Sequence, residues 1–105
     1  MTKSVPQALK DLGKIYEERN AVYGDNYLHF GQVMMGMFPR GLTLETEDDF
    51  NRFALFVWAA SKLTRYAQSF NRGGHADSCD DASVYMQMLN EVDGLVRDKD
   101  IKRTL

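Results

Sequence analysis

The chain has 105 residues, which suits one domain of ordinary size and leaves no room for two. Hydrophobic residues make up 44% of it, so it can form a core, and 13 basic against 15 acidic residues give a formal net charge of −2. That charge argues against general nucleic-acid binding, which needs a basic surface. The single cysteine, Cys79, excludes an internal disulfide.

The sequence also predicts a cytoplasmic location without a membrane partner. The N-terminal residues do not resemble a signal peptide, and the longest strongly apolar stretch, 53–61, is too short to cross a bilayer. We interpret the charged residues 98–105 as a solvated tail of a single helical domain that covers residues 1–105.

The first two predicted helices cover roughly residues 5–20 and 26–38. Ser4 is a suitable N-cap for the first of them, and the sequence Tyr23-Gly24-Asp25 is expected to end it. Its apolar residues recur at spacings of three and four, which is typical of one helical face: Val5, Ala8, Leu9, Leu12, Ile15 and Tyr16. The second segment is rich in methionine, which favours a place in the core or in an oligomer interface.

The third and fourth predicted helices have clearer boundaries. Thr46 is followed by three acidic residues, which is typical of a capped N-terminus, and the third helix is expected to run to about Ser69. The sequence Asn71-Arg72-Gly73-Gly74 indicates a turn, so the fourth helix is expected to start near Asp77 or Ser78. Since no segment alternates with the period of a strand, the prediction is an all-α chain of four helices.

The third and fourth helices are expected to form an antiparallel hairpin, because a connection of about seven residues is typical of such pairs. Arg65 lies about one turn, and Lys62 about two turns, before the end of the third helix. Asp77 and Asp81 lie in the first two turns of the fourth. In an antiparallel pair these positions are at similar heights, so we expect two cations to face two carboxylates.

Asp81 is the position where a structural and a functional interpretation both stay open. It shares a face with Tyr85, Met88 and Val92, so we expect it to point inward, where a carboxylate is costly unless it is paired or binds a metal. A salt bridge to Lys62 or Arg65 is one interpretation, and a ligand site is the other.

Two neighbouring residues have simpler structural interpretations. Asp77 suits an N-cap, with Asp80 three residues later to complete the capping arrangement. Trp58 shares a face with Lys62 and Arg65, so it is either a core residue or a platform for a ligand.

Four short motifs follow one another in a fixed order along about residues 16–90. They are Arg19-x-x-x-Tyr23-Gly24-Asp25, then His29-Phe30, then Lys62-x-x-Arg65, and then Asp77-Ser78-x-x-Asp81-x-x-x-Tyr85. Taken together, this order resembles small phage-enriched MazG-like proteins, which belong to, or lie beside, the all-α NTP pyrophosphohydrolase superfamily. The last two motifs in combination are the specific part of the resemblance.

The resemblance implies a MazG-like four-helix bundle that forms dimers or tetramers, in the host cytoplasm if a phage encodes it. The superfamily removes pyrophosphate from a nucleoside triphosphate with Mg²⁺ held by acidic side chains. The resemblance therefore implies a (deoxy)nucleotide partner and makes Asp77 and Asp81 candidate catalytic and metal-binding residues. The candidate nucleotide-binding residues are Lys62 and Arg65 for phosphates, Tyr23 and Trp58 for stacking on the base, and Tyr85 for a hydrogen bond.

The chain departs from the superfamily in the helix that carries Lys62 and Arg65. Standard members have an E-E-x-x-E motif there, and cations in its place favour direct binding of phosphate over a cage for several Mg²⁺ ions. Three functions therefore stay open. They are a pyrophosphohydrolase-like activity, phosphoryl transfer by a nucleotide kinase without a P-loop, and a non-catalytic protein that sequesters a nucleotide or binds a host protein.

Overall fold

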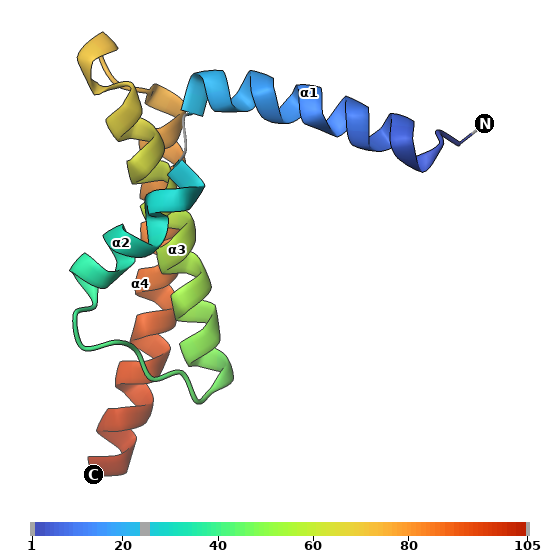
Figure 1. Cartoon of the computed structure of the whole chain (residues 1–105). Coiled ribbons are helices and arrows are strands. Elements are labelled where there is room, and N and C mark those ends of the chain that lie inside the picture. The colour runs from blue at the N-terminus through green and yellow to red at the C-terminus, as the bar shows by residue number, and fades with distance from the viewer. Residues whose placement is uncertain (1, 24–25, 105) are drawn as a thin grey trace. The chain divides into compact units, whose positions relative to one another are not determined.

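A computed structural model describes the backbone of residues 2–23 and 26–104, and the side chains of 2–21 and 27–99. In these residues the chain is all helical (Figure 1), as predicted, and contains no strand. The elements are α1 (Val5–Tyr23), α2 (Asn26–Met37), α3 (Glu47–Gln68), the short 3₁₀ helix η1 (Phe70–Arg72) and α4 (Ala76–Thr104). The charged residues 98–104 continue α4, so most of the predicted tail is a helix end.

The chain divides into two compact units, residues 1–34 and 35–105, which are described separately. In the first unit, Ser4 caps α1 as predicted, because its Oγ accepts a hydrogen bond from the backbone N–H of Gln7 at 3.3 Å. The phenolic oxygens of Tyr16 in α1 and Tyr27 in α2 are 2.9 Å apart. Their rings pack edge to face, with centroids 6.3 Å apart, and so connect the two helices within this unit.

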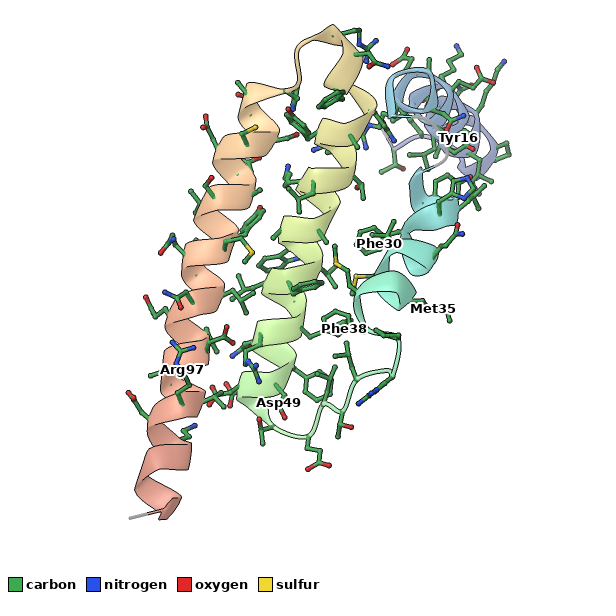
Figure 2. The ribbon with its side chains drawn as sticks, turned by 90° about the vertical axis from the view of Figure 1, so that its left-hand side faces the viewer. Tyr16, Phe30, Met35, Phe38, Asp49 and Arg97 are labelled. Atoms are coloured by element: carbon green, nitrogen blue, oxygen red, sulfur yellow. The ribbon has the colours of Figure 1, made fainter. Side chains whose placement is uncertain are left out.

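The second unit is dominated by α3 and α4, which lie side by side (Figures 1 and 2). One ion pair joins Arg52, near the start of α3, to Asp93, past the middle of α4. Another joins Lys62, near the end of α3, to Asp81, near the start of α4. The two helices therefore run in opposite directions. Their contact buries mainly small and aliphatic side chains, which allow a close approach of the two backbones: Leu55, Ala59, Ala60, Ala82 and Leu89.

Thr46 is the N-cap of α3, as predicted, and it forms a capping box with Asp49. The Oγ1 atom of Thr46 accepts from the N–H of Asp49 at 3.1 Å, and the Oδ2 atom of Asp49 accepts from the N–H of Thr46 at 3.2 Å. A further bond from the N–H of Glu45 reaches the same oxygen at 3.1 Å. These backbone donors lower the pKa of Asp49, because they stabilise its ionised form.

The residue that caps the N-terminus of α4 differs from the predicted one. Helix α4 begins at Ala76, and the Nδ1 atom of His75 accepts from the N–H of Ser78 at 3.2 Å. His75 is therefore the capping residue, and the prediction that Asp77 is the N-cap is wrong. Capping by an imidazole has no simple sequence signature, whereas an aspartate near a helix start does.

Candidate functional site

The expected contact between a cation of α3 and a carboxylate of α4 is present. The Nζ atom of Lys62 lies 3.0 Å from the Oδ2 atom of Asp81. The side chain of Lys62 is 19% exposed, whereas that of Asp81 is 49% exposed. The expectation that Asp81 points into the interior is therefore wrong, and its pairing cannot be explained by the cost of burying a carboxylate.

The side chain of Asp81 is about half exposed because of its place on α4. Ala82, the next residue, is buried in the contact with α3, and so is Leu89 seven residues further on. Asp81 lies one position, or about 100° of rotation, from that buried stripe, so it borders the contact instead of facing it. In the sequence, Asp81 shares a helical face with Tyr85, Met88 and Val92, so the pattern predicted that this whole face is buried. The contact with α3 covers only part of that face.

An aromatic pair lies one helical turn away from this ion pair. The rings of Trp58 in α3 and Tyr85 in α4 are tilted by 52°, with centroids 5.6 Å apart. Trp58 precedes Lys62 by four residues, and Tyr85 follows Asp81 by four, so the two pairs form adjacent rows across the hairpin. Trp58 is 51% exposed, which rules out the interpretation of it as a core residue and leaves about half of its surface accessible.

Arg65 and Asp77 extend these rows toward the turn. Arg65 follows Lys62 by three residues on α3 and is partly buried, and Asp77 precedes Asp81 by four residues on α4 and is exposed. Trp58, Tyr85, Lys62, Asp81 and Arg65 are called the hairpin surface below. Tyr23, the other predicted base-stacking residue, has its side chain outside the described residues.

The described residues of the hairpin surface offer few ligands for a resident Mg²⁺ ion. Among the described residues there is no group of three or more His, Cys, Asp or Glu side chains that could hold a metal. Asp77 and Asp81 supply two carboxylates at most, and the ammonium of Lys62 already lies against one of them. A magnesium ion that enters with a nucleotide, bound mainly by its phosphates, needs only one or two protein carboxylates.

The structure also contains a cavity that the sequence did not predict. It has a volume of about 280 Å³ and lies between the start of α3, the middle of α4 and the segment that precedes α3. Its lining is mostly apolar, with one cation and two carboxylates: Phe38, Leu42, Thr43, Leu44, Asp49, Arg52, Phe53, Phe56, Leu89 and Asp93. In Figure 2, Phe38 points toward α3, and Asp49 lies at the N-terminal end of that helix.

The charged groups of this cavity are tightly paired. The Nε atom of Arg52 donates to the Oδ1 atom of Asp93 at 2.6 Å, and one terminal nitrogen of Arg52 lies 3.5 Å from the Oδ1 atom of Asp49. The hydrogen bond to Asp93 raises the pKa of Arg52. Asp49 and Arg52 are three residues apart and could be paired from the sequence, but Asp93 is 41 residues from Arg52. Only the register of the two helices brings it there.

No family model, curated protein or solved structure matches this chain. Within the part of the chain that the structure describes, no helix is long and apolar enough to span a membrane.

Proposed function

We propose that the chain binds a nucleotide on the hairpin surface and that α1–α4 form a MazG-like four-helix bundle in which α3 and α4 are the antiparallel hairpin. The observation that carries this proposal is the order of groups along one surface. An accessible indole is followed, one turn later, by Lys62 and then by Arg65. A nucleotide has the same order, with an aromatic base at one end and phosphates at the other.

The chemistry of each row supports this assignment. Stacking of a base on an aromatic side chain contributes about 1–3 kcal/mol and tolerates any base. Lys62 and Arg65 supply the charge-assisted hydrogen bonds that phosphate oxygens accept strongly. The ring of Tyr85 lies beside that of Trp58, with centroids 5.6 Å apart. Its hydroxyl is the group proposed to hydrogen-bond the nucleotide.

Pyrophosphohydrolysis is the reaction we propose, with a (deoxy)nucleoside triphosphate as substrate. Its support is the combination of the Lys62-x-x-Arg65 and Asp77-Ser78-x-x-Asp81-x-x-x-Tyr85 motifs. In this proposal Asp77 and Asp81 orient the cations and hold the Mg²⁺ that arrives with the nucleotide. Lys62 and Arg65 offset the negative charge of the phosphates.

A binding protein without turnover is the second candidate. The pairing of Asp81 with Lys62 favours it, as does the lack of a larger carboxylate cluster among the described residues. Such a protein would sequester a nucleotide and would need only the aromatic row and the cations.

A screen of nucleoside mono-, di- and triphosphates with Mg²⁺ tests both candidates. Thermal shift reports binding, and release of pyrophosphate or phosphate reports turnover. Binding with release of pyrophosphate supports the hydrolase, and binding without any product supports sequestration. A screen in which no nucleotide stabilises the protein contradicts the proposed function altogether.

A further inference from the structure

The cavity beside Arg52 is separate from the hairpin surface and has a different chemistry. Arg52 precedes Lys62 by ten residues on α3, which corresponds to about 15 Å along the helix axis. The cavity volume of about 280 Å³ is close to the lower end of the roughly 300–1,000 Å³ range of small-molecule pockets. Ligand pockets typically combine apolar walls with a few convergent polar groups, and this cavity has both.

The apolar part of the cavity combines three phenyl rings with three leucine side chains. Phe38 and Phe56 pack edge to face, with centroids 4.9 Å apart and an angle of 68°, and Phe53 completes the aromatic side. Leu42 and Leu44 line the cavity from the segment before α3, and Leu89 lines it from α4. The faces of phenyl rings carry partial negative charge, so they attract a cation as well as an apolar group.

The charges of the lining also favour a cation. One guanidinium stands against two carboxylates, and both of its assigned contacts are to those carboxylates, at 2.6 and 3.5 Å. With all three groups ionised, the two carboxylates outweigh the guanidinium by one negative charge, which favours a cationic ligand over an anionic one. Asp93 uses its Oδ1 atom for Arg52, while its side chain is 29% exposed and carries a second carboxylate oxygen. Because an ionised carboxylate has about four lone-pair sites, Asp93 has the capacity to accept a further hydrogen bond from a ligand.

From these contacts we propose that the cavity is a binding site for a small organic amine, with an aromatic or branched apolar body and a primary ammonium group. The apolar body packs against Phe38, Phe53 and Phe56. The ammonium group donates to Asp93 and lies near the faces of the rings. This site does not depend on the proposed nucleotide function, because the two sites share no residue.

Three fragments of similar size separate the possible ligand chemistries. 2-Phenylethylamine is an ammonium ion at pH 7, 2-phenylethanol is neutral, and 3-phenylpropionate is an anion. Each is titrated to about 10 mM, because a fragment with about nine non-hydrogen atoms binds with a dissociation constant of about 1 mM. Amide resonances in two-dimensional NMR spectra of the full chain report where each fragment binds.

The proposal expects 2-phenylethylamine to shift the resonances of the residues lining the cavity, and the other two fragments to bind at least tenfold more weakly. Asp93→Asn should reduce the affinity for the amine at least tenfold. Asp98→Asn is the matched control, because it removes the same charge from an exposed position on α4 outside the cavity. It should leave the affinity unchanged.

A second variant covers the case in which Asp93→Asn fails to fold. Leu42 is 47% exposed in the segment before α3, so Leu42→Trp places a larger side chain in the cavity without changing a helical residue. It should abolish the shifts caused by the amine while the thermal midpoint changes little. Equal or tighter binding of 3-phenylpropionate or 2-phenylethanol would overturn the ammonium assignment. Amine binding that survives both variants, or no binding by any fragment, would overturn the site.

Discussion

The Nζ atom of Lys62 and the Oδ2 atom of Asp81 are 3.0 Å apart, although about half of the Asp81 side chain remains exposed. An ion pair with one half-exposed partner contributes little to folding, because water reaches the carboxylate of Asp81 and weakens its attraction to Lys62. Its position next to Trp58 and Tyr85 is therefore more informative than its strength. It places a cation and a carboxylate one turn from an accessible aromatic ring.

Replacement of Asp81 by asparagine should leave the protein folded and nearly as stable. An exposed ion pair is worth about 0–1 kcal/mol, so the free energy of unfolding should fall by no more than that. The amide no longer competes with a ligand for Lys62, so triphosphate binding without Mg²⁺ should become tighter. Urea unfolding measures the first effect, and calorimetry in the presence of EDTA measures the second. A loss of about 3–5 kcal/mol, typical of breaking a fully buried pair, would contradict the exposed geometry.

Lys62→Ala should weaken binding of a nucleoside triphosphate more than binding of the corresponding monophosphate. The triphosphate offers more negative charge, and a hydrogen bond to a charged group is worth about 1.5–3 kcal/mol. Affinities for the three phosphate lengths, measured by calorimetry, check this. Arg97→Ala is the control, since Arg97 is an exposed cation on α4 beyond the hairpin surface (Figure 2). An equal loss for all phosphate lengths would argue against Lys62 as a phosphate ligand.

Trp58→Ala should weaken the binding of nucleoside mono-, di- and triphosphates by a similar factor, because all of them carry the base. The expected loss is about 1–3 kcal/mol per base stacked on the ring. Trp58 is the single tryptophan of the chain, so quenching of its fluorescence gives a second measurement on the wild type. Phe50→Ala removes an exposed aromatic ring from the same helix, outside the hairpin surface, and should have no effect. Retained binding in the Trp58 variant would exclude stacking.

The sequence predicted well those features that depend on neighbours in the chain. The capping box of Thr46 and Asp49 and the N-cap of Ser4 are local, and both are present. The Lys62–Asp81 contact followed from the length of the turn, which sets the register of α3 against α4.

The features that the sequence did not predict depend on contacts between distant segments. The exposure of Asp81 depends on how wide a face of α4 is covered by α3, which a residue pattern does not specify. The cavity requires Arg52 of α3 to meet Asp93 of α4 while Phe38 packs on Phe56. His75 caps α4 through its imidazole, where an aspartate was the expected choice.

We also expect the protein to be at least a dimer in solution. On α3 and α4, large apolar side chains of the second unit remain about half exposed, among them Leu63, Val84, Met88 and Leu95. Among the described residues of these two helices, few are buried and most of those are small. Burial of the exposed apolar side chains in an interface between two chains would therefore stabilise the fold. Multi-angle light scattering at micromolar concentration measures the mass. A mass of 12.0 kDa, that of one chain, would contradict the expectation.

The turn between α3 and α4 offers a test of the register on which the hairpin surface depends. Gly73 and Gly74 have φ angles of +96° and +85°, which an alanine adopts only at a cost of about 1–2 kcal/mol. A Cβ atom at Gly73 would meet nothing within 4 Å, whereas one at Gly74 would lie 2.6 Å from a ring carbon of Tyr66.

Gly73→Ala should therefore lower the stability by the backbone cost alone. Gly74→Ala should lower it further and displace Tyr66, one residue after Arg65. Chemical denaturation of both variants measures the difference, and NMR shifts of Lys62 and Arg65 report whether the site moves. Equal stability of the two variants would show that a Cβ atom at position 74 does not clash with the ring of Tyr66.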